Sequence, residues 1–292
     1  MARIVGVISL ATGAILDWAI APYAGKGTGE NALLRQCLPT FKAGDIVLGD
    51  CYYASFFLVA TFIKMGIDVV FPQHASRHCD FRKGKRLGKK EHLVEWRKPV
   101  RPEWLDEADY ADFPDKIVVR EVSIKKELAG FQTKSRVIVT TFLDPSKVTK
   151  NDLSVLYDCR WFVEISFLAI KETMKMDVLR CKTPEMVHKE IGAHLLAYNL
   201  VRQIMVKSAI KHGKNPREMS FKLALQCIFS FTQVGVFSVN NSDIYEKMLK
   251  AIASKKVGNR AGRSEPRRVK RRPKAFPRLQ KERHLYRKKG VA

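Results

Sequence analysis

Four polar side chains recur at fixed spacings in the mostly apolar segment LYDCRWFVEISFLAIKETMK. They are Tyr157, Arg160, Glu164 and Lys171. Spacings of three, four and seven residues place side chains on one face of an α-helix. We therefore expect one stripe that carries a carboxylate, two cations and a phenol. Charges in an apolar, mostly buried helix are costly without partners, so the stripe is either a binding site or a structural Arg160–Glu164 ion pair.

A second carboxylate, Asp50, follows the apolar run Ile46-Val47-Leu48-Gly49, which has the pattern of a short buried strand. In open α/β sheets, ligands bind at the carboxyl ends of the strands, and Asp50 occupies such an end. The structural alternative is that Asp50 caps the helix that follows it.

The pattern Y-x-x-R-x-x-x-E-x-x-x-x-x-x-K, with Trp161 after the arginine, resembles the signature around the third acidic residue of bacterial insertion-sequence transposases of the DDE group (insertion-sequence family four). The resemblance covers nearly the whole chain, including VLGDCYYAS, DVLRCKTPEMVHKEI and EPRRVKRRPK. It implies an α/β (α+β) fold of the ribonuclease H-like type, a mixed sheet flanked by helices with a mainly β insertion between the second aspartate and the glutamate. It also implies an enzyme that cleaves and transfers DNA strands.

Such chemistry explains the need for carboxylates. Water or a 3′-hydroxyl must attack phosphorus in line, and two Mg²⁺ ions about 3.5–4 Å apart can activate the nucleophile and stabilise the leaving oxygen. Mg²⁺ prefers oxygen ligands, so Asp50 and Glu164 are the expected catalytic and metal-binding residues. By resemblance, Tyr157, Arg160 and Lys171 contact phosphates or terminal nucleotides of double-stranded DNA, at the transposon ends or the target.

The chain departs from the family pattern in two places. Cys51 stands where the family usually has an arginine, so we expect no phosphate contact there. The family's first aspartate lies on a strand upstream of the hairpin with which this chain opens. Asp17 is the only acid in the opening strands and is expected to be structural. We therefore expect an amino-terminally truncated copy that cuts DNA weakly or not at all.

The alternative function is a non-catalytic remnant that still binds DNA through its basic surface. A ribonuclease H-like nuclease unrelated to transposition is disfavoured by the signature and the basic tail. The formal net charge of +24 on 292 residues favours a polyanionic partner, although an RNA-binding protein would share it. Residues 255–292 hold sixteen Lys and Arg against two Glu. We expect this tail to be disordered and to bind DNA through Arg267, Arg268, Lys270, Arg271 and Arg272.

Hydrophobic periodicity and turn residues predict the elements. The expected strands are 3–10 and 14–21, forming a hairpin around Thr12-Gly13, then 45–49, 68–71, 117–125 and 135–142. The expected helices are 30–41, 54–65, a signature helix that begins near Thr149, a helix that opens at Thr183-Pro184-Glu185, and 219–231. Thr149 or Asn151 is expected to cap the signature helix, and Thr183 the helix after it. The expected parts are the first part of the core at 1–71, a β-rich insertion at 72–150, carboxyl-terminal helices at 151–254 and a basic tail at 255–292.

The six cysteines are scattered, with no C-x-x-C pair. No signal peptide or membrane-spanning run is predicted, so reduced thiols in the bacterial cytoplasm, at the nucleoid when bound to DNA, fit best. A homo-oligomer on DNA is compatible with this interpretation. A zinc site built from His74, His78, Cys79 and His92 is an alternative. Its spacing matches no common metal pattern, and we prefer to interpret these residues as parts of solvated loops.

Overall fold

A parallel β-α-β unit carries Asp50, which follows its first strand. A computed structural model describes residues 2–126, 134–236 and 241–257. In it, β3 (Ile46–Leu48) and β4 (Asp68–Pro72) pair in parallel, and α2 (Phe56–Lys64) connects them. The helix buries most of its apolar side chains, including Val59 and Phe62. The predicted crossover unit is confirmed.

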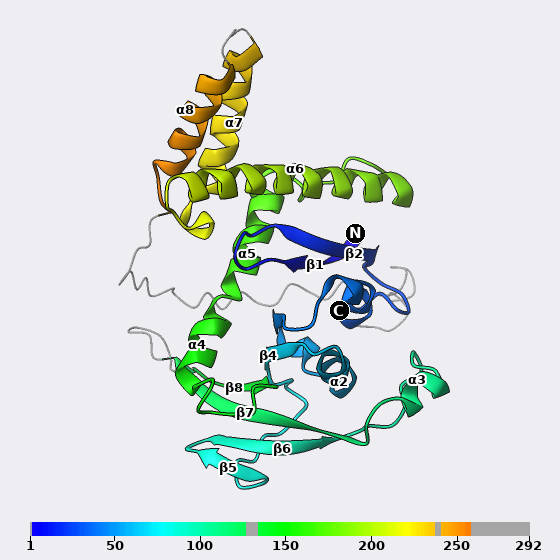
Figure 1. The fold of residues 1–292 in the computed structure, drawn as a ribbon. Coiled ribbons are helices and arrows are strands. Elements are labelled where there is room, and N and C mark those ends of the chain that lie inside the picture. Colours follow the sequence, from blue (N-terminus) through cyan, green and yellow to red (C-terminus); the bar gives the residue numbers. More distant parts are fainter. Residues whose placement is uncertain (1, 127–133, 237–240, 258–292) are drawn as a thin grey trace, which may run out of the picture. The chain divides into compact units, whose positions relative to one another are not determined.

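The sheet continues from β4 through strands that lie later in the sequence. Its order is β3-β4-β8-β7-β6-β5, and every neighbouring pair except β3–β4 is antiparallel. The added strands are β5 (Lys85–Gly88), β6 (Glu91–Arg97), β7 (Lys116–Lys126) and β8 (Lys134–Thr140). A short helix, α3 (Glu107–Ala111), lies between β6 and β7 in sequence. The β insertion is therefore part of one mixed sheet that includes β3 and β4 (Figure 1).

A separate hairpin opens the chain. It consists of β1 (Ala2–Ile8) and β2 (Ile15–Pro22), and among the described residues β1 pairs only with β2. Gly13 takes a positive φ of 78° in the turn, as a glycine readily can. The predicted hairpin is confirmed. The next helix, α1 (Glu30–Gln36), is shorter than predicted, because a 3₁₀ turn (Leu38–Thr40) with Pro39 in its first turn follows it.

Helices make up most of the remaining described chain. They are α4 (Lys150–Asp158), α5 (Trp161–Leu168), a π-helix (Ala169–Thr173), α6 (Pro184–Lys211), a 3₁₀ turn (Pro216–Glu218), α7 (Phe221–Val236) and α8 (Asn241–Ala253). Thr149 and Thr183 cap α4 and α6 as predicted, by accepting from the backbone N–H groups of Asp152 and Met186. No helix among the described residues is long and apolar enough to cross a membrane.

The hairpin packs against α6 through specific polar contacts. Asn199 accepts from the N–H of Ile15 and donates to its carbonyl, both at 2.8 Å, as a neighbouring strand would. The buried Tyr198 hydroxyl donates to the carbonyl of Gly13 at 2.9 Å. These contacts hold the turn end of the hairpin on the longest helix.

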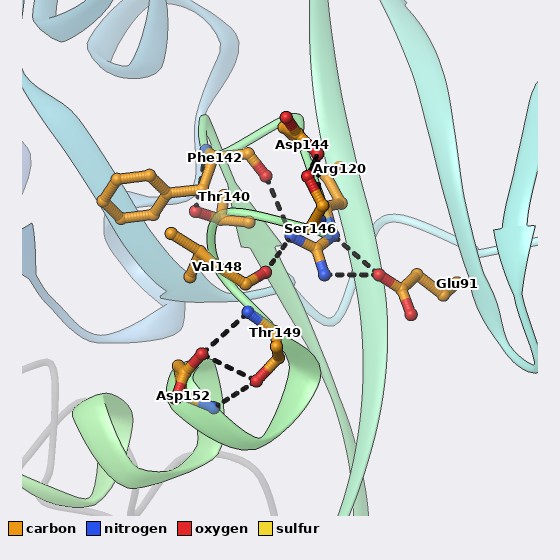
Figure 2. A network of polar contacts seen from close by, with 9 residues as sticks. All are labelled: Glu91, Arg120, Thr140, Phe142, Asp144, Ser146, Val148, Thr149 and Asp152. Atoms are coloured by element: carbon orange, nitrogen blue, oxygen red, sulfur yellow. Dashed lines mark hydrogen bonds and ion pairs between the residues drawn. The ribbon is translucent and has the colours of Figure 1, made fainter.

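A buried arginine connects the six-stranded sheet to the start of α4. Arg120 on β7 has no exposed surface, and it donates to Glu91 of β6 through Nε and Nη2. Its Nη1 donates to the carbonyls of Phe142 at 3.2 Å and Val148 at 2.7 Å, in the turn before α4 (Figure 2). Thr149 then caps the helix through a capping box with Asp152. The sheet thereby fixes where α4 begins.

Apolar packing reinforces this connection. Val70, Val122 and Ile138 from three strands pack with Leu153 and Tyr157 of α4. Together with the hairpin and the flanking helices, the mixed sheet gives the α/β architecture of the ribonuclease H-like type that the resemblance implies. Contacts group residues 1–126 and 134–259 into one compact unit. The four-part division expected from the sequence stays a prediction.

Candidate active site

Asp50 lies at the carboxyl end of β3, as its place in the sequence predicts. It is exposed, and its side chain accepts a short hydrogen bond from the N–H of Cys51, so it also caps the 3₁₀ turn Cys51–Tyr53. Desolvation by neighbouring groups opposes ionisation, but the hydrogen bonds from Cys51 and the charges of Arg160 and Arg136 outweigh it. The pKa of Asp50 therefore lies below its usual value. The strand-end and capping interpretations both describe this residue.

The signature segment is not one continuous α-helix. α4 ends at Asp158, and the N–H of Arg160 bonds to the carbonyl of Tyr157 three residues back, at 3.0 Å. Such i−3 bonds tighten the chain before α5 begins. The segment is also less buried than its composition predicts. Trp161 and Leu168 are more than half exposed, at 58% and 59%. The predicted single, mostly buried helix is wrong on both points.

Three of the four signature residues nevertheless lie together. Arg160 Nη2 and Glu164 Oε1 form an ion pair at 2.6 Å, which confirms the predicted contact. The Arg160 guanidinium also lies over the ring of the buried Tyr157, 5.8 Å from its centroid. Burial raises the pKa of the Tyr157 hydroxyl, and the nearby arginine charges only partly offset this effect.

Lys171 takes a different position. It lies in the π-helix that follows α5, where the wider turn changes the α-helical spacing from Glu164. Its side chain is exposed, and its ammonium lies 5.8 Å from the ring centroid of Phe167. The described contacts of Lys171 do not include the other three signature residues, and its place in a shared site stays a prediction.

Arg136 belongs to the same cluster, although the sequence did not identify it as a site residue. It lies on β8, 5.3 Å from the ring centroid of Tyr157, and its charge helps to lower the pKa of Asp50. Strand alternation gives a usable signal, because it puts Arg136 on the same face as Ile138, which packs with Tyr157. The sequence of β8 alone does not show that α4 packs against this face of the strand.

A groove of about 590 Å³ adjoins this cluster. It is lined by residues of β1 and β3 and, among others, by Asp50, Arg160, Val163 and Phe167. A larger cavity of about 870 Å³ lies between α2 and residues 99–117, and none of the predicted site residues lines it. Of the candidate site residues, Asp50 and Arg160 thus line the groove, and none lines the larger, more apolar cavity.

Comparison with known proteins agrees with this geometry. The family model described as "Transposase DDE domain" matches residues 2–200. The chain belongs to this transposase family. It is also 27% identical over 266 residues to "Transposase InsG for insertion sequence element IS4" of Escherichia coli (strain K12). That match covers 85% of this chain and 55% of the relative, so the chain spans about half the length of the curated relative.

Two further predictions about this transposase-family chain concern residues away from the cluster. Asp17 accepts from the Thr40 hydroxyl at 2.6 Å and from the N–H of Trp18 at 2.8 Å, as a structural residue would. The five basic residues predicted to bind DNA, at 267–272, lie outside the described residues, as does the predicted disorder of the tail beyond residue 257.

Proposed function

We propose that this chain forms part of the active site of a DDE transposase that cleaves DNA strands and joins them at the ends of an insertion sequence. Asp50 and Glu164 are its proposed metal ligands. The observation that carries the proposal is that one arginine serves both carboxylates. Arg160 pairs with Glu164 at 2.6 Å, and its charge helps to keep Asp50 ionised. Carboxylates far apart in the sequence therefore share one electrostatic environment.

The two carboxylates suit a hard divalent cation such as Mg²⁺. Enzymes of this family generally use divalent metal ions. Asp50 is exposed and favoured in its ionised form, and the Glu164 side chain keeps 41% of its surface exposed. Oxygen ligands that remain partly solvated are what Mg²⁺ prefers, because it retains several of its waters. When bound, the metal would supply Lewis-acid activation of the attacking and leaving oxygens.

The remaining residues of the cluster position and neutralise DNA in this proposal. Arg136 and Arg160 both lie over the Tyr157 ring and present cations beside Asp50. An arginine suits a phosphate because its planar guanidinium can donate two parallel hydrogen bonds. Lys171, further along the chain, would add a point charge to a more distant phosphate. The proposed partner is double-stranded DNA, and the basic residues 267–272 would extend the contact.

Cleavage and strand-transfer assays with Mg²⁺ or Mn²⁺ on duplexes that carry the element's ends test the catalytic assignment. Asp50→Asn and Glu164→Gln should each abolish any metal-dependent product while leaving DNA affinity within a few fold. Glu103→Gln, a change to an exposed acid that does not line the groove, is the matched control and should retain activity. Products that persist undiminished in both site variants would refute the assignment of Asp50 and Glu164.

The alternative is a DNA-binding chain that does not cut. It is favoured by the fact that Asp50 and Glu164 each already accept a hydrogen bond from the protein. In that case the wild-type chain should bind DNA and give no product with either metal. Arg136→Gln should still weaken binding and reduce the slope of log affinity against log salt by about 0.9 for a lost phosphate contact. An unchanged slope would remove Arg136 from the proposed DNA surface.

A further inference from the structure

A cysteine, a histidine and a glutamate converge in the β insertion, apart from the candidate active site. Cys79 comes from the connection between β4 and β5, His92 from β6 and Glu121 from β7. One ligand atom of each lies within 4.8 Å of the other two. His92 and Glu121 are directly opposite each other in the β6–β7 register, and they are only 1% and 3% exposed. The prediction that His92 is a solvated loop residue is therefore wrong.

The hydrogen bonds around His92 define which nitrogen is free. Its Nδ1 lies 2.6 Å from the carbonyl oxygen of Lys83. A carbonyl cannot donate, so Nδ1 must carry the proton. In neutral His92, Nε2 therefore presents its lone pair, and it does so 3.0 Å from Glu121 Oε2 and 3.8 Å from Cys79 Sγ. Two acceptors that face each other inside a protein need a proton or a metal ion between them.

Glu121 is held in the same way. Its Oε1 accepts from Trp96 Nε1 at 3.1 Å and from Gln73 Nε2 at 3.2 Å. These donors fix the carboxylate and leave Oε2 directed at His92. Backbone and side-chain partners that orient a histidine and a carboxylate in this manner are typical of the outer shell of a metal site.

We propose that Cys79 Sγ, His92 Nε2 and Glu121 Oε2 bind one zinc ion. With bonds of about 2.0 Å to nitrogen or oxygen and about 2.3 Å to sulfur, tetrahedral ligand atoms lie roughly 3.3–3.6 Å apart. The separations of 3.0 and 3.8 Å bracket that range. A thiolate and a carboxylate would neutralise the dication. Thiolate and imidazole ligands select zinc over Mg²⁺, so this site differs in chemistry from Asp50 and Glu164.

With three protein ligands, a tetrahedral zinc would take a water molecule as its fourth ligand. The three ligands come from three segments, so one ion would fasten the connection between β4 and β5 to the β6–β7 pair. The competing occupant is a proton, which would make His92 and Glu121 an ordinary buried ion pair. Without a metal, the Cys79 thiol would only hydrogen-bond to Glu121 or His92, whereas a metal would bind it as a thiolate. The experiment must therefore report on the sulfur.

The test is cobalt titration of the purified full-length chain, read as the thiolate-to-cobalt charge-transfer band and displaced by zinc. The expected result is one ion per chain, confirmed by elemental analysis, and a melting temperature that rises on zinc addition. Cys79→Ser should abolish the charge-transfer band, and His92→Gln should weaken binding at least tenfold. Cys181→Ser and His188→Gln, which change a cysteine and a histidine outside the β insertion, are the matched controls and should bind as wild type does.

Two results would overturn the proposal. One is a wild-type chain that gives no charge-transfer band and retains no zinc. The other is a band that persists in Cys79→Ser, which would place the metal elsewhere. Cys79 is only partly buried, so its serine variant reports on binding even where His92→Gln fails to fold. Asp50→Asn should leave zinc binding unchanged, which separates this site from the proposed catalytic one.

Discussion

Replacing Arg120 by methionine should be one of the most damaging single changes in the described chain. The guanidinium is fully buried and serves Glu91 together with the carbonyls of Phe142 and Val148. Removing one partner of a buried ion pair costs about 3–5 kcal/mol, because the other charge stays buried and unpaired. A domain's unfolding free energy is typically about 5–15 kcal/mol. At about 2–4 °C per kcal/mol, the melting temperature should fall by roughly 6–20 °C.

The double variant Arg120→Met/Glu91→Met separates the ion pair from the rest of the network. Its loss of stability should be smaller than the sum of the two single losses by about 0.5–3 kcal/mol, the usual coupling between contacting residues. Recovery should be partial, because the carbonyls of Phe142 and Val148 still lack their donor. Urea denaturation followed by tryptophan fluorescence gives the energies, and hydrogen exchange reports on α4.

The expected exchange pattern follows from the geometry. Arg120 holds the turn before α4 (Figure 2), so amides of residues 150–158 should lose protection more than those of α6. Arg82→Met, which removes an exposed pair with Asp80, is the control and should leave the melting temperature unchanged. Single losses that simply add, or undisturbed exchange in α4, would refute the reasoning.

Three smaller perturbations test other parts of the fold. Thr149→Ala removes a capping box and should lower the free energy of unfolding, measured by urea denaturation, by about 1 kcal/mol. If the exposed neighbour variant Asn151→Ala loses as much, the capping role is contradicted. Asp50 is favoured in its ionised form because it accepts hydrogen bonds from Cys51 and lies near the charges of Arg160 and Arg136. Its contribution to the free energy of unfolding should therefore be complete above its usual pKa of 3.8 and be lost as the pH falls through the lower folded value. The difference in unfolding free energy between wild type and Asp50→Asn should shrink over this range, and a constant difference would show that the shift is absent. In Gly13→Ala, the new side chain must adopt a positive φ of 78°, and its Cβ would lie 2.0 Å from Arg217 Nη1. The free energy of unfolding should therefore fall by at least about 1–2 kcal/mol. An unchanged melting temperature would show that the turn can relax.

The sequence predicted those elements whose signals are local. The parallel unit, the hairpin and both threonine caps depend on apolar runs, a turn glycine and side chains that bond within three residues. β5 and β6 were missed, because residues 73–98 are rich in basic and polar side chains. That polarity has a structural use. His92 lies inside the sheet in contact with Glu121, so the burial of polar groups there depends on strand register.

The site shows the same division between local and distant signals. The Arg160–Glu164 pair could be predicted from helical spacing, since i and i+4 residues are neighbours. The break before α5 and the π-helix at Lys171 could not, because the spacing argument assumes a uniform α-helix. Arg136 was missed because its partner, Tyr157, lies on another element. Spacing within one element thus identified the residues, and contacts between elements decided which of them meet.

The break in the signature segment has a physical explanation in how its two halves are held. α4 is fixed by the sheet, through Arg120 and the packing of Tyr157 on Ile138. α5 is fixed separately, because Arg217 donates to the carbonyl of Phe162 at 2.9 Å and to the Ser166 hydroxyl at 3.3 Å. Two helices held by different parts of the fold need not share an axis, and the tightened turn between them accommodates the difference. Arg160 lies in that turn, within reach of Tyr157 on one side and Glu164 on the other. Its position beside Asp50 therefore depends on both attachments, so loosening either one should disturb the cluster without touching any of its residues.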